Sequence, residues 1–311
     1  MMERLKLFNT DIEVSRLCMG GCPMGQYGWG IVQEQELIDA VHAAIDNGIN
    51  FFDTADTYGL GTSERTLGKA LGSERNKVVI ATKFGVRAGN GKTFYDNSPQ
   101  WIETALHNSL KRLGTDYIDL YQVHYRDATP IEVVVETLER FKNQGKIRAY
   151  GLSNIQKKDI GEFLPFAGSF ASVQDEFSLA CRKNENDLLE LTEKLSLTPM
   201  TWGSLGQGIL TGKYTQDSSF GADDRRSRKV YVNFHGEKLI KNLHIVDAMR
   251  PIARKHQVQL AAVAVRFILQ QIKGSVVLVG AKCPSQIKGS LEAMDWRLSP
   301  DEIQRLDEVS A

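Results

Sequence analysis

The stretch "INFFDTAD", residues 49–56, starts with the apolar run of a buried β-strand and ends in polar side chains. Short apolar runs rich in β-branched residues are typical of strands that are buried on both faces of a parallel sheet. Seven other stretches have the same character. They cover residues 13–21, 77–85, 117–125, 146–154, 171–179, 197–205 and 275–282. Together with the first stretch they predict eight strands.

Helical patterns lie between the predicted strands. "QELIDAVHAAIDNG" (35–48) has apolar residues at helical spacing and ends in Gly, and "PIEVVVETLERFKNQGK" (130–146) ends in the same way. "SPQWIETALHNSLKRLG" (98–114) has a Ser N-cap, Pro at the first helical position and Gly at its end. Eight strands alternating with helices predict a (β/α)₈ TIM barrel. No Pro- or Ser-rich linker interrupts the series, so we expect a single domain over residues 1–311.

A doubly wound open sheet is the alternative architecture. If it bound a dinucleotide, it would normally carry a G-x-G-x-x-G turn after its first strand. The chain has "GGCPMGQYGWG" at this place, residues 20–30, and this stretch lacks the required spacing. The absence of the fingerprint therefore favours the barrel.

The composition argues against several classes of function. The 311 residues include 38 Lys or Arg and 38 Asp or Glu, so no general attraction to nucleic acid or to a membrane surface is expected. No stretch approaches the ~20 apolar residues of a membrane span, and the N-terminus lacks the apolar run of a signal peptide. The cysteines, Cys18, Cys22, Cys181 and Cys283, do not have the spacing of metal ligands. We therefore expect reduced thiols, no metal and a cytoplasmic location.

Four chemically active side chains lie at the carboxyl ends of predicted strands, where the active sites of barrels are built: Asp53, Tyr58, Lys83 and His124. A buried Lys beside a Tyr is expected to lower the pKa of the phenol, and an Asp would keep that Lys charged and oriented. Tyr58 is then a candidate general acid or base, and His124 could hydrogen-bond a substrate carbonyl. This chemistry suits delivery of a proton to an oxygen while hydride reaches the carbon.

Hydride transfer requires a cofactor, and the later strand ends carry residues suited to one. The loop "GSLGQG" (203–208) offers backbone N–H groups to a pyrophosphate, and Trp202 could stack on a nicotinamide. Lys282 could meet a 2′-phosphate. Three side chains could bond the nicotinamide carboxamide: Ser153, Asn154 and Gln174. Simpler interpretations remain for two of these features, namely a flexible turn for the glycine loop and a solvated helix-start Lys for Lys282.

Three further polar features receive other interpretations. The irregular stretch 215–236 is long enough to be a lid or a binding loop, although a tolerated surface insertion explains its length almost as well. Asp56 is assigned to the turn that follows the strand at 49–56. Glu64 is assigned to the first turn of the next helix, where a carboxylate interacts favourably with the helix dipole.

The chain resembles the aldo-keto reductases along essentially its whole length. Six motifs carry the resemblance, in this order: "GINFFDTADTYGLGTSE", "VVIATKFG", "LKRLGTDYIDLYQVH", "QGKIRAYGLSN", "LGQGILTGKY" and "VGAKCPSQI". The "FYDNSP" segment and the C-terminal tail are most similar to the bacterial branch that includes general-stress and inositol-operon reductases. The resemblance implies a barrel whose N-terminal hairpin, roughly residues 4–13, covers the barrel bottom. It also implies NADPH-linked reduction of aldehydes or ketones without metal or flavin.

The resemblance further assigns roles to individual positions. The family's catalytic tetrad falls on Asp53, Tyr58, Lys83 and His124. Its cofactor contacts fall on Gly21, Ser153, Asn154, Gln174, Trp202, Gly203, Ser204, Leu205, Gly206, Gln207, Gly208, Lys213, Gly280, Lys282 and Gln286. These positions imply NADP(H) as the cofactor, with NAD(H) as an alternative.

Departures from the family pattern affect the adenosine end of the cofactor site. Relatives often have a basic residue after the Lys282 position, where this chain has Cys283. They commonly have an acidic residue and an Asn where Gly289 and Ser290 stand, and many have Ser-Pro at residues 203–204, which are Gly-Ser here. The loss of these side chains predicts weaker adenosine contacts and a modest preference for NADPH over NADH.

Tyr125 and Arg126 replace a frequent Trp-Pro pair after the catalytic-type His, which changes the substrate pocket and not the chemistry. The leading hypothesis is a carbonyl reductase or alcohol dehydrogenase of EC 1.1.1 type, with a small-molecule carbonyl substrate. One alternative is a cofactor-binding regulatory or interaction subunit with little turnover. Another is a keto-sugar reductase of a biosynthetic pathway.

Overall fold

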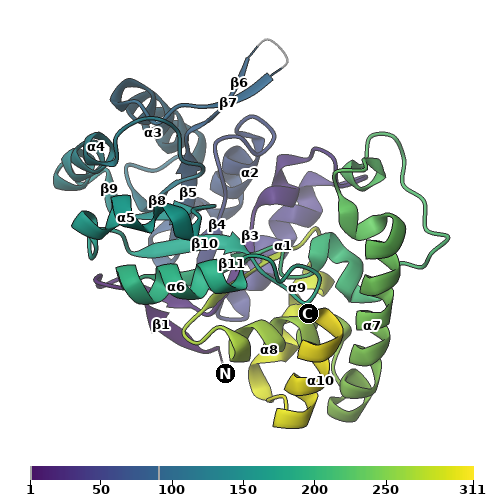
Figure 1. The fold of residues 1–311 in the computed structure, drawn as a ribbon. Helices are drawn as coiled ribbons and strands as arrows, with labels where there is room; N and C mark the ends of the chain where they lie inside the picture. Colours follow the sequence, from purple (N-terminus) through teal and green to yellow (C-terminus); the bar gives the residue numbers. More distant parts are fainter. Residues whose placement is uncertain (1, 90–91) are drawn as a thin grey trace.

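A closed barrel of eight parallel strands forms the centre of the computed structural model, which describes residues 2–89 and 92–311 (Figure 1). The strands follow one another around the barrel in chain order, and the last pairs with the first, with Val277 opposite Leu17. The barrel strands are β3 (Leu17–Gly20), β4 (Phe51–Asp53), β5 (Val79–Phe84), β8 (Ile118–Val123), β9 (Ile147–Ser153), β10 (Ser172–Glu176), β11 (Thr198–Trp202) and β12 (Val276–Gly280). The predicted (β/α)₈ fold is confirmed.

The first predicted strand, residues 13–21, is divided between two sheets. Its start is β2 (Glu13–Ser15), which pairs antiparallel with β1 (Arg4–Lys6), and its end is β3 of the barrel. Arg16 is the junction between the two sheets. Its backbone N–H donates to Glu3 on the hairpin side at 2.9 Å, and its carbonyl accepts from Val277 of β12 at 2.8 Å. The alternating pattern runs through this junction, so the sequence alone showed one strand.

Helices surround the barrel (Figure 1), and the three helical patterns described above are present as α1, α3 and α4. Ser98 caps α3 as predicted, because its hydroxyl accepts from the Trp101 N–H at 3.4 Å, and Gly114 ends the helix with a left-handed φ of 67°. The helices are α1 (Glu34–Asp46), α2 (Thr62–Leu71), α3 (Pro99–Leu113), α4 (Ile131–Asn143), α5 (Ile160–Phe163), α6 (Glu185–Leu195), α7 (Gly236–His256), α8 (Leu260–Gln271), α9 (Pro284–Leu291) and α10 (Pro300–Ser310).

Alternation along each strand separates two apolar cores. Phe51 belongs to the cluster inside the barrel, whereas Phe52 belongs to the layer between strands and helices. Leu120 lies in the inner cluster by the same alternation. The period of two then directs Asp53 and Gln122, at the carboxyl ends of their strands, toward the barrel mouth. The pattern that builds the core therefore also positions the polar residues of the mouth.

The N-terminal hairpin closes the other end of the barrel. Leu7, Ile12 and Val14 are buried in the same cluster as the inward-facing strand residues. The hairpin predicted at roughly residues 4–13 is therefore present as a cap on the barrel bottom, at β1 and β2. The barrel interior is therefore filled by apolar side chains at this end, whereas Asp53 and Gln122 give the carboxyl end its polar character.

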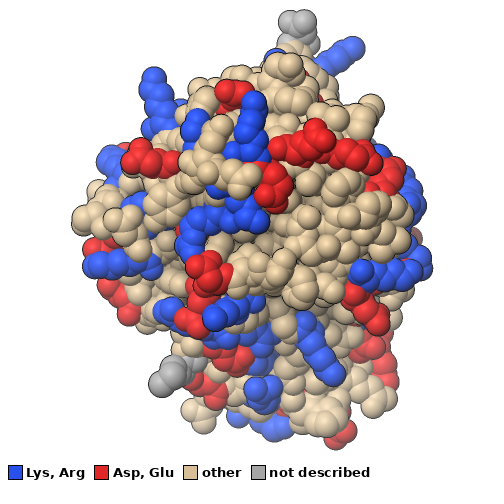
Figure 2. Space-filling model, turned by 90° about the vertical axis from the view of Figure 1, so that its left-hand side faces the viewer, with Lys and Arg blue, Asp and Glu red and all other residues tan. Residues whose placement is uncertain are grey.

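A second hairpin, β6 (Val86–Gly89) and β7 (Lys92–Tyr95), projects from the region between β5 and α3 (Figure 1). On the face shown in Figure 2, basic and acidic side chains are interspersed. Within the described ranges, no helix is long and apolar enough to cross a membrane.

Candidate active site

A cavity of about 500 Å³ opens at the carboxyl ends of the barrel strands. Asp53 at the end of β4, His124 just after β8 and Tyr58 from the turn after β4 all line it. Lys83 on β5 lies behind this wall, 1% exposed, with its ammonium 5.2 Å from the centroid of the Tyr58 ring. The Tyr58 and His124 rings meet edge to face at 6.0 Å. The structure therefore brings the four predicted catalytic residues together.

Asp53 is the acceptor at the centre of a buried polar network. Its Oδ1 accepts from the Lys83 ammonium at 2.5 Å, and Lys83 also donates to the Thr54 carbonyl at 2.9 Å. Its Oδ2 accepts from the Gln122 amide at 3.0 Å and from the Gln174 amide at 2.8 Å. A buried ion pair is stable only when its remaining donors and acceptors are satisfied. These bonds hold the Lys83 charge in one position beneath Tyr58.

Gln122 and Gln174 both bind Asp53, a contact that was not predicted from the sequence for either residue. Gln174 lines the cavity where a nicotinamide contact was predicted, but its Nε2 is directed at Asp53. Gln122 was not predicted to belong to the site at all. The signal was present, because Gln122 stands two residues before His124 and so faces the same way along β8.

His124 is held in its neutral form. Burial and the nearby Lys83 charge keep the pKa of His124 well below its usual range. Its Nδ1 is buried and has no hydrogen-bond partner among the described residues. A neutral imidazole has one N–H to donate, so His124 can hydrogen-bond a carbonyl oxygen in the cavity without carrying charge.

Tyr58 is held in its protonated form. Burial raises the pKa of Tyr58 well above its usual range, and charges at Cys22 and Asp53 would raise it further. Burial outweighs the lowering of the Tyr58 pKa that was expected from Lys83, because burial is the larger influence and the ammonium is bonded to Asp53. A protonated phenol is the form that a general acid requires.

The predicted cofactor residues lie along the same cavity, with one exception. Gly206 faces the protein interior, since a Cβ there would lie 2.8 Å from the side chains of Ala180 and Ile209. The others line the cavity: Gly21, Ser153, Asn154, Gln174, Trp202, Gly203, Ser204, Leu205, Gln207, Gly208, Lys213, Gly280, Lys282 and Gln286.

The shape and polarity of this wall fit a nicotinamide dinucleotide. A Cβ on Gly21 would clash with the Ser63 hydroxyl at 2.8 Å, and one on Gly280 would press on Pro23 at 3.2 Å, so side chains are disfavoured at both points. The indole N–H of Trp202 is buried without a partner among the described residues. Narrow glycine surfaces and unpaired donors are what a flat ligand with amide and phosphate oxygens requires.

Positive charge gathers at the far end of the cavity. Lys282 is partly buried and donates to the Trp29 carbonyl. Burial lowers the pKa of Lys282, and the charges of Arg226 and Lys213 lower it further, while the Asp224 carboxylate acts in the opposite direction. Like charges brought together in this way are stabilised by an anion, so a phosphate is the natural occupant of this end.

The long irregular stretch forms part of the wall. It contains the short helices η6 (Arg225–Ser227) and η7 (Val232–Phe234), and it contributes Arg225, Arg226 and Tyr231 to the lining of the cavity. This placement favours the binding-loop interpretation of residues 215–236 over a surface insertion. None of these three side chains was predicted, because a loop without periodicity does not reveal which of its residues face inward.

The departure at Gly289 has a local explanation. A Cβ at this position would lie 2.5 Å from the side-chain oxygen of Gln259, which itself lines the cavity. Gln259 therefore occupies space that a larger residue at 289 would need. Gln286 has a structural role as well, because its side-chain oxygen accepts from the Lys282 N–H at 2.9 Å before α9 begins.

Aromatic rings form the opposite wall. Tyr125 stacks on His124 with ring centroids 5.1 Å apart, and Tyr95 of β7 stacks on Tyr125 at 4.9 Å. Arg126 turns away from the cavity and pairs with Glu162. Of the two residues that replace Trp-Pro, only Tyr125 therefore contributes to the pocket.

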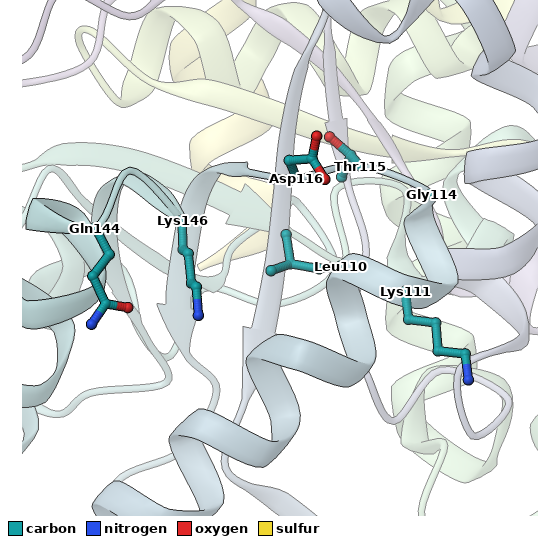
Figure 3. A pocket seen from close by; sticks show the side chains of 7 residues that line it. All are labelled: Leu110, Lys111, Gly114, Thr115, Asp116, Gln144 and Lys146. Atoms are coloured by element: carbon teal, nitrogen blue, oxygen red, sulfur yellow. The ribbon is translucent and has the colours of Figure 1, made fainter.

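A second hollow of about 610 Å³ opens at the opposite end of the barrel (Figure 3). It precedes β8 and β9, and Figure 3 shows that its side chains, such as Lys111 and Gln144, diverge instead of converging on one centre. In the described part of the chain, no group of three or more His, Cys, Asp or Glu side chains could hold a metal ion. The cavity at the strand ends is therefore the candidate active site.

Behind the site, the two further acids of the opening stretch have different surroundings. Glu64 lies in the first turn of α2, as predicted, and is fully buried. It pairs with Arg112 at 2.5 Å and accepts from the Thr82 hydroxyl at 2.7 Å. Asp56 has a buried carboxyl oxygen without a partner among the described residues. Burial, with a contribution from the Glu64 charge, raises the pKa of Asp56 to about 7.

We expect Asp56→Asn to stabilise the protein at pH 8. The folded state binds the Asp56 proton more tightly than the unfolded state, so stability falls as pH rises from about 4 through about 7 and stays lower above it. Removing the charge should recover on the order of 3 kcal/mol at pH 8 and little at pH 4. Chemical unfolding at both pH values measures this, with the exposed Asp217→Asn as control. Equal effects of D56N at both pH values would contradict the prediction.

The structure thus combines a parallel eight-stranded barrel with a buried Asp–Lys ion pair, a Tyr and a His at the mouth of a glycine-walled cavity, an arrangement suited to an oxidoreductase built on a barrel. Residues 16–311 match the sequence profile described as the aldo/keto reductase family. The chain belongs to this family, and it is an oxidoreductase of carbonyl reduction.

Relatives of the chain match over nearly its whole length. It is 34% identical to the aldo-keto reductase YhdN of Bacillus subtilis, over 99% of this chain and 93% of that protein. It is 32% identical to the NADH-specific methylglyoxal reductase of Escherichia coli, over 99% of this chain and 98% of that protein. Among solved structures, the glycerol dehydrogenase AKR11B4 from Gluconobacter oxydans is 34% identical to this chain. It covers 98% of this chain and 94% of its own, with a TM-score of 0.88. An aldo-keto reductase from Klebsiella pneumoniae in complex with NADPH is 26% identical and covers 99% of this chain and 95% of its own, with a TM-score of 0.76.

Proposed function

We propose that the protein is an NADP(H)-dependent reductase of aldehydes or ketones, with Tyr58 as the general acid. The observation that carries the proposal is the pairing of a protonated Tyr58 with a neutral His124 on one cavity wall, above the buried Lys83–Asp53 ion pair. The nicotinamide cofactor supplies the hydride. The remaining steps belong to residues of the chain.

His124 would orient the substrate by donating a hydrogen bond to its carbonyl oxygen. Tyr58 would deliver its proton to that oxygen as negative charge develops there. Lys83 would stabilise the resulting phenolate through its charge, since its ammonium lies 5.2 Å from the Tyr58 ring centroid. Asp53 would hold Lys83 in this position through their direct bond.

The cofactor wall would bind the dinucleotide with its nicotinamide toward Trp202 and its adenosine toward Lys282. We propose NADPH as the preferred cofactor because Lys282 and Lys213 bring positive charge to that end, beside an Arg226 that is paired with Asp224. The relatives give examples of both cofactors, since one solved structure holds NADPH and the methylglyoxal reductase is named as NADH-specific.

Rates of NADPH and NADH oxidation across a panel of aldehydes, ketones and keto-sugars test the proposal. A reductase oxidises cofactor in step with the disappearance of a carbonyl compound. A cofactor-binding interaction subunit would bind NADPH with little turnover of any compound in the panel. The same measurement therefore separates the two functions, and the keto-sugar arm tests the biosynthetic alternative.

We expect Lys282→Ala to weaken NADPH binding by about 10- to 150-fold while NADH binding changes little. A charge-assisted hydrogen bond from Lys to a phosphate is worth roughly 1.5–3 kcal/mol, and NADH has no phosphate at this position. At saturating cofactor kcat should stay near the wild-type value. Titration of both cofactors against the variant measures this, with the exposed Lys288→Ala of α9 as control. Equal weakening of NADPH and NADH would show that Lys282 does not recognise the 2′-phosphate.

A further inference from the structure

Two adjacent arginines of the long loop have opposite surroundings. Arg226 is saturated by Asp224, with bonds at 2.5 and 2.9 Å, and it also donates to the Tyr214 hydroxyl. Its charge acts on Lys282, so it belongs to the adenosine end of the cavity. Arg225 lines the same cavity, but no carboxylate in the described residues lies within ion-pair distance of it. One of the two charges is neutralised within the protein and the other is not.

Arg225 is held in place without an acidic partner among residues 2–89 and 92–311. Its backbone N–H donates to the Gly28 carbonyl at 3.0 Å. Its side chain packs on Gly28, where a Cβ would lie 2.2 Å from the Arg225 Cγ, so only glycine leaves room for it. The guanidinium lies over the Tyr27 ring at 4.9 Å from the centroid and 6.0 Å from the Trp29 ring. A long cationic side chain is thus positioned, partly desolvated and still unpaired.

Arg225 lies between the two ends of the cavity, because it packs on Trp29, whose carbonyl accepts from Lys282, and its charge also acts on Tyr58. The loop that contains Gly28 packs against the turn that carries Tyr58, since a Cβ on Gly25 would lie 2.9 Å from the Tyr58 carbonyl carbon. Burial dominates the pKa of both Tyr58 and Cys22, and the Arg225 charge is among the groups that act against it. The guanidinium is therefore close enough to influence the group that we assign to proton transfer.

The charges around Arg225 leave the guanidinium available. Asp53 is neutralised by Lys83, and Glu176 on the far wall accepts from the Gln207 amide at 3.2 Å. An unpaired guanidinium in partly desolvated surroundings binds planar oxyanions well, because its fork of donors matches a carboxylate or phosphate in two parallel bonds.

We propose that Arg225 is a specificity residue that binds an anionic group of the substrate, so that the enzyme prefers carbonyl compounds bearing a carboxylate or a phosphate. The proposal rests on the proposed function, since it names the substrate class of the same site. Carboxylate and phosphate share the chemistry that the guanidinium recognises, and the experiment distinguishes them. A cofactor phosphate is the competing occupant, and binding measurements distinguish that as well.

The test compares substrates with and without an anionic group on the same carbonyl skeleton. Succinic semialdehyde is paired with its methyl ester, and glyceraldehyde 3-phosphate is paired with glyceraldehyde. We expect the wild type to favour at least one anionic member by tenfold or more in kcat/KM. Arg225→Met should lower kcat/KM for the anionic substrate by about 10- to 100-fold, mostly by raising KM. It should change kcat/KM for the neutral substrate of the same pair by less than about twofold. The pair that responds identifies the anion.

Arg228→Met is the matched control, because Arg228 belongs to the same loop and donates to the Tyr27 hydroxyl at 3.1 Å but is exposed and does not line the cavity. It should leave both pairs unchanged. The proposal would be overturned if the wild type preferred neither anionic substrate. It would also be overturned if R225M lost kcat/KM equally for the anionic and the neutral substrate of a pair. A loss of NADPH affinity in R225M with unchanged substrate preference would overturn it as well, and would assign Arg225 to the cofactor.

A binding measurement separates this proposal from the proposed function. Calorimetric titration with succinate, which is not reduced, should show binding to the wild type in the presence of NADP⁺ and at least tenfold weaker binding to R225M. If no carbonyl compound is reduced with either cofactor but this difference is found, the proposed function fails and the anion site stands. If reduction is found and succinate binds both proteins equally, the anion site fails and the proposed function stands.

Discussion

Replacement of Tyr58 by Phe is expected to lower kcat by about 10²–10⁴-fold, the typical worth of a positioned proton donor. The substitution removes only the hydroxyl, and the ring keeps its edge-to-face contact with His124. Steady-state rates with NADPH and an aldehyde measure the effect, and quenching of the tryptophan fluorescence follows cofactor binding. Cofactor affinity should stay within a few-fold of the wild type.

The matched control is Tyr125→Phe, which removes a hydroxyl from the same cavity wall. Burial raises the pKa of Tyr125 to about 12, so it too is a protonated phenol, but we assign it no proton transfer. It should retain kcat within a few-fold. Retention of near-normal kcat by Y58F, or an equal loss in Y125F, would show that another group is the acid.

Lys83→Met is expected to be at least as damaging to kcat as Tyr58→Phe and also to destabilise the fold. The variant loses the cation that would stabilise the Tyr58 phenolate and leaves the carboxylate of Asp53, 2% exposed, without its counter-charge. Removing one partner of a buried ion pair typically costs about 3–5 kcal/mol. Chemical unfolding measures this loss. The pH–rate profile should also shift, because the Lys83 charge helps to keep the pKa of His124 low.

A double variant separates the two effects of Lys83. Asp53→Asn with Lys83→Met removes both charges, so no uncompensated carboxylate remains, and much of the lost stability should return. Activity should not return, because the cation beneath Tyr58 is still missing. If the double variant were as unstable as K83M, burial of an unpaired charge would not be the cause. If it recovered activity, Lys83 would not be needed for the chemistry.

The barrel could be predicted from the sequence because its signals are local and repeated. Each strand is a short apolar run, and caps such as Ser98 and Gly114 mark where a helix begins and ends. The division of the first predicted strand at Arg16 could not be predicted from the sequence. The backbone hydrogen bonds of Arg16 to Glu3 and Val277 separate the two sheets, and a local sequence pattern does not reveal bonds to residues elsewhere in the chain.

The catalytic site could be predicted where a strand fixes the direction of a side chain. Asp53, Lys83 and His124 follow the period of two along their strands, and Gln122 could have been found by the same rule. The pKa of Tyr58 was misjudged because the sequence shows that a Lys is near but not that burial outweighs it. The loop residues Arg225 and Arg226 were missed because no periodicity tells which of the two is neutralised by Asp224.

The closure of the barrel has a consequence for how the protein is made. β3 and β12 pair residues 17–20 with residues 277–280, so the first and last strands can meet only when almost the whole chain has been synthesised. Until then the nascent sheet has two unpaired edges, which are sites for pairing with other chains. Since Gly280 ends β12 and Gly21 directly follows β3, and these two strands are joined only at that final step, the cofactor wall is completed last. A chain that stops before β12 is therefore not a smaller enzyme but an open sheet prone to aggregation.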